Sequence, residues 1–456
     1  MRTRFVFTVV GLSLAFSAVA RGDGLADRAR VYASSYGTSR SLIPPYSRQT
    51  GLACSACHYQ FLSLTPFGRE FKQNGYTMTA QKPIEDAKNG KLSLSPFAGL
   101  GTMVQASYTG VSKAVPGTQN HSVAFPQQLS VFLAGKITSK VGIFSQVTYS
   151  GADGSVGIDN IDLRYANQTD LGSTALTYGF TLNNNPTISD LWNTTPAWGF
   201  PYAASDVAPT GAAATLIDGA LAQDALGLTG YALVGGTVYG EFGVYRSAHQ
   251  GQGAADSSSV NTIDGAAPYW RLSLQKKWDK TYLMVGTYGL HAALFPTGIA
   301  GSTDKLTDVG VDAQWEQQVG SGNLVARGTY IHESRTLDGS VAAGAAASAS
   351  GNLSTERINA SYYPNQVVGL TLGLFQTTGS QDALLYAPGP VTGSQLNDPK
   401  TSGFVGEVDF NAWQNTRLGL QYTAYGNFNG ANNNYDGAGR NASDNNTLYL
   451  LVWVVF

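Results

Sequence analysis

The fold class of this chain is decided by the stretch Val309-Gly310-Val311-Asp312-Ala313-Gln314-Trp315-Glu316. Most odd positions are apolar and the even positions are polar or small, which is the period-two alternation of a β-strand with unlike faces. The same alternation recurs at residues 270–275, 404–411 and 418–425. A strand with one face suited to lipid and the other to water is the unit of a transmembrane β-barrel.

The spacing between these segments supports a barrel and gives it an orientation. We expect short turns at residues 138–140, 235–236, 279–280, 320–322, 364–366 and 414–415. Long polar connections lie between them, at residues 110–127, 183–224, 248–267, 293–303, 335–352, 379–401 and 428–445. Outer-membrane barrels have short periplasmic turns and long outer loops. The sequence therefore predicts an all-β barrel of about sixteen antiparallel strands over residues 91–456, with mobile outer loops at 339–351 and 427–446.

The composition agrees with a membrane barrel, although by itself it also allows a secreted β-sandwich or β-helix. Only 13% of residues are charged, against roughly 25% in soluble proteins. The chain has 54 Gly, 24 Tyr and 19 Phe. After the N-terminal segment, no apolar run reaches the ~18 residues of a membrane-spanning helix.

The N-terminal segment predicts export. A basic start, Met1–Arg4, precedes an apolar run to Phe16 and then Ala18-Val19-Ala20, which is the layout of a cleaved signal peptide over residues 1–20. Removing Arg2 and Arg4 from the 28 basic residues leaves 26 against 30 acids, a net charge of −4. Nothing in this balance suggests nucleic acid as a partner.

Cys54-Ser55-Ala56-Cys57-His58 is a C-x-x-C-H motif, the attachment signature of c-type haem. Two thiols three residues apart on one helical turn reach the two vinyl groups of one porphyrin, and the following His58 supplies an axial imidazole. A Cys54–Cys57 disulfide is the alternative in an oxidising periplasm. A zinc site is weaker, because the chain has only these two cysteines.

The residues after the motif predict a short helix over 66–74. Thr65 suits the N-cap, Pro66 the first helical position, and Gly75 the residue past the end. On that helix Phe67 and Phe71 share a face at i,i+4 and are candidates to wall the porphyrin.

Two further candidate groups surround this helix. Arg69 and Lys72 either meet haem propionates or form an ordinary solvated face. Met78 is the candidate sixth iron ligand, because residues 21–90 contain no other Met and no His besides His58. The alternatives are that Met78 only fills an apolar gap, or that a barrel residue such as His121 provides the ligand.

A larger resemblance rests on these residues. Ile43–His58, then Phe67-Gly68-Arg69-Glu70-Phe71-Lys72 and Gly75-Tyr76-Thr77-Met78, resemble the signature of the fused cytochrome–porin family, the outer-membrane iron oxidases of ferrous-iron-oxidising bacteria. The likeness covers about 36 residues; the barrel agrees only in length, architecture and position. Tyr46 and Thr65 depart slightly from the pattern.

The resemblance implies a cofactor and a site. It implies one covalent haem c on Cys54 and Cys57, with His58 as the proximal ligand. The residues that match the flanking pattern are implied to lie in the haem pocket: Arg48, Gln49, Thr50, Gly51, Phe67, Gly68, Arg69, Phe71, Lys72, Gly75 and Tyr76. It also implies a small α-helical cytochrome domain at residues 21–90. Because seventy residues are few to bury a haem, we expect this domain to plug the periplasmic mouth of the barrel.

The implied activity is that of an Fe(II)-oxidising oxidoreductase. Electrons from extracellular Fe(II) would pass through the haem to a periplasmic cytochrome or cupredoxin. Two alternatives stay open: a haem-bearing porin that exchanges electrons with another extracellular donor or acceptor, and a plain diffusion porin with a Cys54–Cys57 disulfide. The inward acids Asp312, Glu316, Glu407 and Asp409 would either draw cations into the lumen or simply form a polar lining.

Overall fold

The computed structural model describes residues 43–81, 99–248, 261–296 and 301–456. The predicted signal peptide, residues 1–20, lies outside the described residues, as do residues 21–42 and 82–90 of the predicted haem domain. Residues from Pro44 to Phe456 belong to one compact unit.

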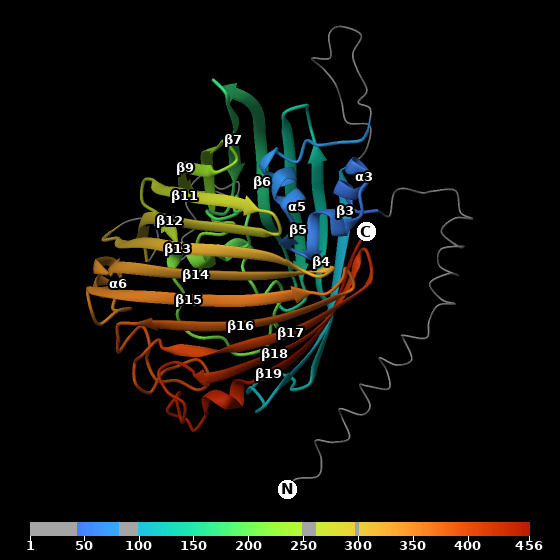
Figure 1. Cartoon of the computed structure of the whole chain (residues 1–456). Helices are drawn as coiled ribbons and strands as arrows, with labels where there is room; N and C mark the ends of the chain where they lie inside the picture. Colours follow the sequence, from blue (N-terminus) through green and yellow to red (C-terminus); the bar gives the residue numbers. More distant parts are fainter. Residues whose placement is uncertain (1–42, 82–98, 249–260, 297–300) are drawn as a thin grey trace, which may run out of the picture. The chain divides into compact units, whose positions relative to one another are not determined.

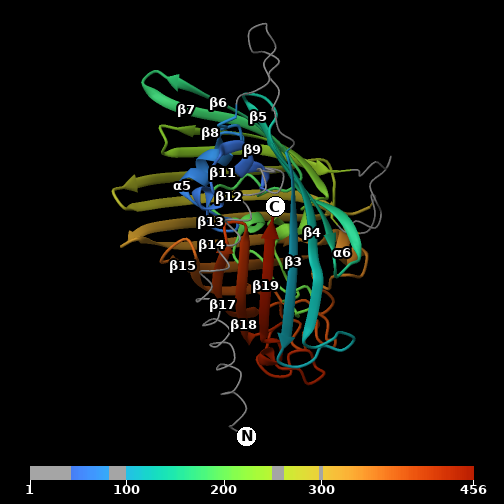
Figure 2. The same ribbon diagram turned by 90° about the vertical axis from the view of Figure 1, so that its right-hand side faces the viewer.

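Sixteen long antiparallel strands form one closed sheet (Figure 1). The last strand, β19, pairs with the first, β3, so that no edge is left free (Figure 2). A two-residue strand, β10 (Thr262–Ile263), adds a short pairing to β12. The long strands are β3 (Leu100–Val111), β4 (Ser122–Lys136), β5 (Val141–Ser150), β6 (Ser155–Leu171), β7 (Thr174–Asn183), β8 (Ala225–Val234), β9 (Val238–Ser247), β11 (Ala267–Trp278), β12 (Thr281–Phe295), β13 (Asp304–Val319), β14 (Gly322–Thr336), β15 (Ser350–Tyr363), β16 (Val368–Gly379), β17 (Thr401–Trp413), β18 (Thr416–Asn427) and β19 (Thr447–Val455).

The predicted alternation of faces is confirmed. On β13, Val311 is 52% exposed on the outer surface, whereas Asp312 is 6% exposed and faces the lumen. The same rule holds on β11, where Leu272 is exposed and Arg271 is buried. A closed sheet leaves no backbone group unpaired and its outer face is apolar, which is what a hydrocarbon environment requires.

The predicted turn pattern is also confirmed, with one exception. Six of the seven connections at one end are the predicted short turns, and the seventh, between β6 and β7, is equally short. At the other end the loops are long except between β5 and β6, where a tight turn contains Gly154 in the left-handed region. Below, the two ends are called the short-turn end and the long-loop end.

The outer loops that we expected to be mobile are interlocked. The carboxylate of Asp382 accepts hydrogen bonds from the backbone of Ala347 and Ser348 in the neighbouring loop. In the Asn-rich loop, Tyr435 is fully buried, and Arg440 donates to the carbonyl of Ala114. Buried aromatic side chains and hydrogen bonds from charged side chains to the backbone thus hold these loop sequences in place. Short helices in these loops are α6 (Asp338–Ala342) and the 3₁₀ helix η4 (Ala442–Asn445).

Two segments enter the barrel from opposite ends. Residues 44–81, here called the plug segment, fill the short-turn end (Figure 1). The segment contains α3 (Pro45–Thr50), α4 (Cys54–Cys57), β1 (His58–Gln60), β2 (Ser63–Leu64) and α5 (Pro66–Gln73). From the long-loop end, residues 184–224 fold back between the walls and form the infolded loop, with η2 (Pro196–Trp198) and η3 (Leu216–Ala220).

None of the helices in the described residues has the length and hydropathy that a membrane-spanning helix needs.

Candidate functional site

The C-x-x-C-H motif forms a single helical turn, α4, with His58 directly after it. The thiols of Cys54 and Cys57 are half-buried and are not joined by a disulfide. Thr65 holds the turn in place through two hydrogen bonds. Its hydroxyl donates to Ala56 O at 2.6 Å, and its backbone N–H donates to Cys57 O at 2.9 Å. Both thiols therefore remain available on one turn, as covalent attachment to a porphyrin requires.

His58 carries a nitrogen without a partner. Its Nδ1 atom is buried and has no hydrogen-bond partner in the part of the chain that the structure describes. Burial lowers the pKa of the His58 imidazole to about 4. The ring is therefore neutral at physiological pH, which is the form that binds iron. The Nδ1 atom of His58 is thus not engaged by the described protein groups, and a neutral imidazole with a free ring nitrogen fits a residue that binds a metal.

The predicted helix is confirmed as α5, and it packs tightly on the motif. Thr65 caps it by accepting a hydrogen bond from Gly68 N at 3.1 Å, and Pro66 takes the first position. A Cβ atom on Gly68 would overlap the carbonyl group of Cys57. Only glycine lets α5 approach the motif this closely.

The two phenylalanines of α5 have different surroundings. Phe71 is buried in a cluster with Tyr46, at 4.9 Å between ring centroids, and with Tyr76, at 6.0 Å. Phe67 is half-buried. Tyr76 is further fixed by a 2.7 Å hydrogen bond from its hydroxyl to Asp162 on β6. Tyr46, Phe71 and Tyr76 thus form an aromatic cluster that joins α3 and α5 to the barrel wall.

The solvated-face interpretation of Arg69 and Lys72 is wrong, since both side chains are 6% exposed. Arg69 forms an ion pair with Glu316 on β13 and lies 4.4 Å from the ring centre of Tyr282. Lys72 donates to two carbonyls of the infolded loop, Ile188 O at 2.6 Å and Asp190 O at 2.7 Å. Both cations therefore bond to the barrel wall and the infolded loop. Whether either also meets a propionate stays a prediction.

The remaining predicted residues lie at the edge of the plug segment. Arg48 donates to Leu100 O at the start of β3. Met78 is half-buried, and its backbone carbonyl accepts from the side chain of Gln49 at 2.8 Å. Met78 thus stays a candidate ligand. The His121 alternative is wrong, because His121 lies in the loop between β3 and β4 at the long-loop end, with its Nδ1 2.6 Å from the Tyr108 hydroxyl.

Gln49 is a structural residue whose function the sequence did not reveal. It is fully buried and makes three bonds: its amide group donates to Tyr76 O and Met78 O, and its oxygen accepts from Lys136 N on β4. It ties both ends of the plug segment to the wall. A lone Gln before a motif gives no sequence signal for this, because its partners are backbone atoms.

The plug segment contacts the wall on every side of the lumen. The contacts join Tyr46 to Ile143 O on β5, Tyr76 to Asp162 on β6, Gln73 O to Tyr231 on β8, Arg69 to Glu316 on β13, Ser63 to Arg327 on β14, Tyr59 to Tyr363 on β15, Gln60 to Glu407 on β17 and Phe61 to Trp453 on β19. Strands from all parts of the closed sheet take part. The segment therefore spans the cross-section of the barrel.

The infolded loop fills the lumen above the plug segment. Trp192 is 1% exposed, donates to the hydroxyl of Tyr282 at 2.6 Å, and lies 5.3 Å from the ring of Tyr239. Asp190 lies 3.5 Å from Arg271 on β11. A signal for this burial was present in the sequence, since Trp192, Trp198 and Phe200 are unusual in a loop that is meant to face water.

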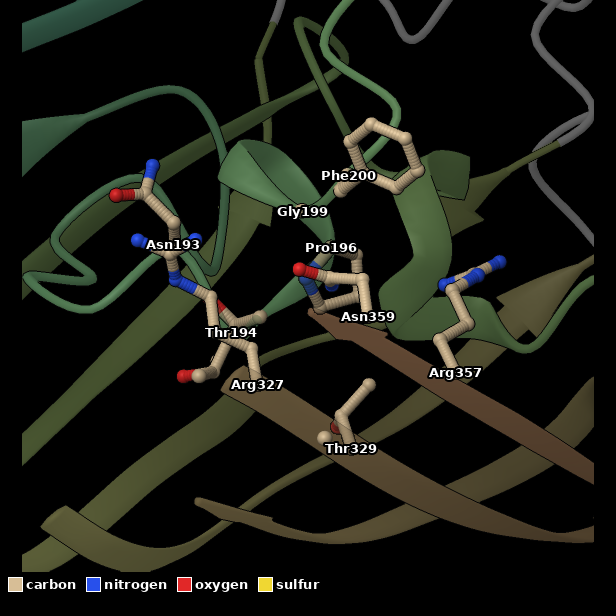
Figure 3. Close-up of a pocket in the computed structure, with 11 residues that line it drawn as sticks. Asn193, Thr194, Pro196, Gly199, Phe200, Arg327, Thr329, Arg357 and Asn359 are labelled. Carbon is tan, nitrogen blue, oxygen red and sulfur yellow. The ribbon is translucent and has the colours of Figure 1, made fainter. Parts of the chain in front are cut away.

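A small cavity remains between this loop and the inner wall (Figure 3). Arg327 and Asn359 reach into it from β14 and β15, and Asn193, Thr194 and Phe200 line it from the infolded loop. Its accessible volume of about 20 Å³ is that of one water molecule. The side chain oxygens of Thr195 and Asn359 are buried without a protein partner here.

Each inward acid predicted from the sequence is paired with an arginine. Arg271 bonds Asp312 at 2.6 Å, Arg69 bonds Glu316, and Arg417 bonds both Glu407 and Asp409, at 2.7 and 2.5 Å. Paired carboxylates attract cations far less than free ones, so these four acids fit the polar-lining interpretation. Among the described residues, no group of three or more His, Cys, Asp or Glu side chains is arranged to hold a metal ion.

No family model and no curated protein matches the chain. Among solved structures, the chain is similar to OmpT of Vibrio cholerae (trimer form; TM-score 0.44, 9% identity, 79% of this chain and 99% of that chain). It is also similar to OmpF of Salmonella typhi (TM-score 0.42, 12% identity, 78% and 97%) and to the channel DcaP of Acinetobacter baumannii (TM-score 0.42, 12% identity, 78% and 96%).

The closed sheet of sixteen long strands, with its apolar outer face and polar lumen, makes this chain a β-barrel of the bacterial outer membrane with a porin-like architecture.

Proposed function

We propose that this chain is an outer-membrane electron-transfer protein that oxidises extracellular Fe(II). In this proposal Cys54 and Cys57 would hold a haem c covalently, and His58 and, as a candidate, Met78 would bind its iron. A periplasmic cytochrome or cupredoxin receives the electron. The observation that carries the proposal is the α4 turn itself: two thiols that are not joined in a disulfide, followed by a neutral imidazole whose buried Nδ1 has no partner among the described residues, held inside the short-turn end of a barrel.

The residues of the chain have separable roles in this function. A bound haem c supplies a reversible one-electron change at its iron. Thr65 and Gly68 hold the α4 turn against α5. Arg69, Lys72 and Tyr76 fix α5 to the wall and to the infolded loop. Rigid anchoring of this kind limits the reorganisation that accompanies electron transfer, because the residues around the site cannot move far.

Fe(II) is proposed as the donor on the family resemblance and on the position of the plug segment. The periplasmic end of the barrel is blocked, so the extracellular side of the lumen ends inside the protein. Ferric product is then retained outside the cell, where it cannot precipitate in the periplasm.

The first experiment is haem staining of the purified protein after denaturing electrophoresis. We expect the wild type to stain and a Cys54→Ser, Cys57→Ser variant to lose the stain while keeping the barrel. The second experiment adds Fe(II) to the oxidised holoprotein at acidic or neutral pH. Appearance of the reduced haem spectrum supports iron oxidation. If dithionite reduces the haem but Fe(II) does not within minutes, Fe(II) is not the donor, and the haem exchanges electrons with another extracellular donor or acceptor.

A plain diffusion porin is the second candidate, and the barrel itself favours it, since sixteen strands are enough to enclose an aqueous channel. The plug segment and the infolded loop weigh against it, because they meet through Lys72 inside the lumen. Planar-bilayer recording separates the two candidates. We expect no stable conductance steps for the folded wild type, whereas steady porin-sized steps in a haem-free protein would establish the diffusion porin.

A further inference from the structure

A group of lysines faces the short-turn mouth. Lys136 continues the lumen-facing positions of β4, after the buried Ser130 and Ala134. Lys277 does the same on β11, after Arg271 and Ser273. Lys140 and Lys280 sit on the turns that follow β4 and β11, and both are exposed. Here Lys136, Lys140, Lys277 and Lys280 are called the mouth lysines.

The mouth lysines are not neutralised by the wall. Unlike the arginines deeper in the lumen, none of the four takes part in an ion pair within the described part of the chain. Arg48 adds a fifth, half-exposed cation. The anions described at this end are the exposed Glu70, Asp170 and Asp279 and the C-terminal carboxylate of Phe456, whose backbone pairs with Thr102 at the start of β3. Five cations against four anions leave the described part of this mouth with a small positive balance, although the whole chain carries a net charge of −2.

The same mouth exposes the approach to the motif. The residues directly before Cys54, which are Gly51, Leu52 and Ala53, are all exposed, with Leu52 at 40%. One mouth lysine is tied to the plug segment, because the backbone N–H of Lys136 donates to the side chain of Gln49 at 2.7 Å. A small apolar contact beside a rim of like charge is the arrangement of weak, rapidly exchanging redox interfaces.

We propose that this mouth, with the exposed Leu52 and the cations Arg48, Lys136 and Lys140, is the docking surface for a periplasmic electron carrier with an acidic contact face. The inference rests on the proposed function and adds the chemistry of the partner. Charge complementarity steers such encounters and can raise association rates by about 10–10³-fold at low ionic strength. A basic carrier would be repelled from the same surface.

The lipid-facing lysine provides a contrast. Lys276 lies on the outer side of β11, where its ammonium group is 5.5 Å from the ring centre of Trp278. A Lys–Trp pair at the end of a strand is placed for the lipid headgroup region. Substitution of the mouth lysines therefore tests binding to an acidic protein face, whereas substitution of Lys276 tests binding to an anionic membrane.

The first test uses reduced holoprotein in neutral detergent and two small oxidants, ferricyanide (anionic) and tris(phenanthroline)cobalt(III) (cationic). At low salt we expect the Lys136→Glu, Lys140→Glu variant to react about tenfold more slowly with ferricyanide and faster with the cobalt complex. Lys113→Glu, Lys305→Glu, at the long-loop end, should change neither rate. Equal rates for the wild type and the mouth variant would overturn the proposal.

The second test does not require the haem, so a failure of the proposed function is distinguishable from a failure of the docking surface. A fluorescein-labelled hexaglutamate peptide is titrated into the folded protein and followed by anisotropy. We expect salt-sensitive binding that Lys136→Glu, Lys140→Glu abolishes and Lys276→Glu leaves intact. Binding that is lost only in Lys276→Glu would assign the anion site to the lipid-facing rim and refute the docking surface.

Discussion

Gly68 is in contact with Cys57: a side chain on Gly68 would occupy the space of the Cys57 carbonyl group. This contact joins α5, which anchors the plug segment to the barrel wall, to the turn that carries both thiols. The position of the motif inside the barrel is therefore set by a glycine three residues after a helix cap.

Replacing Gly68 by alanine should disturb the motif more than the barrel. The methyl group forces α5 away from the α4 turn, and overpacking of this kind costs about 1–3 kcal/mol. We expect less covalent haem per barrel, measured by pyridine haemochrome absorbance against protein concentration. Gly240→Ala is the control, because a Cβ there meets nothing within 4 Å. Equal haem content in the two variants would contradict the packing argument.

Breaking the Arg69–Glu316 pair should release the plug segment. Both side chains are at most 8% exposed, and removal of one partner from a buried pair costs about 3–5 kcal/mol. We expect Arg69→Met to make residues 44–81 sensitive to protease while the strands stay resistant. The exposed Lys113–Asp444 pair, with the lysine side chain 52% exposed, serves as control: Lys113→Met should cost no more than about 1 kcal/mol.

The docking of the plug segment should strengthen as the pH rises above neutrality. Burial, aided by Arg164, lowers the pKa of Lys72 from 10.5 to about 7. An undocked Lys72 keeps its proton up to about pH 10.5. Between pH 7 and pH 10.5 the undocked form therefore binds more protons than the docked form. Over this range the free energy of docking becomes more favourable by up to about 1.4 kcal/mol per pH unit. Proteinase K release of the segment should therefore slow from pH 7 to 9.5. Lys72→Met should remove this dependence, and the exposed Lys140→Met should keep it.

The infolded loop should depend on Arg271. This arginine lies between Asp190 of the loop and Asp312 of β13, and 4.8 Å from the ring centre of Trp192. Arg271→Met leaves two buried carboxylates without their cation, so the loop should loosen and transient conductance events should appear in planar bilayers. Arg246→Met, on an exposed position of β9, should stay silent. Absence of conductance events in both variants would show that the plug segment alone closes the lumen.

Some features followed from local pattern alone. Alternation along β13 fixed which side chains face lipid, because a strand has a period of two whatever it packs against. Thr65 and Pro66 fixed the start of α5, because capping satisfies backbone groups within one turn of chain. The five residues from Cys54 to His58 likewise lie on a single turn, and the haem that they indicate stays a prediction.

The tertiary structure decided what those local patterns could not. A solvated face stayed open as an alternative for Arg69 and Lys72 because their partners, Glu316 and the carbonyls of Ile188 and Asp190, lie more than a hundred residues away. Asp312 and Glu316 looked like free acids until Arg271 and Arg69 were brought to them. A sequence determines periods, caps and short motifs, because these depend on neighbours along the chain. Which charges are neutralised, and whether the lumen is filled, depends on chain closure, which brings distant segments into contact.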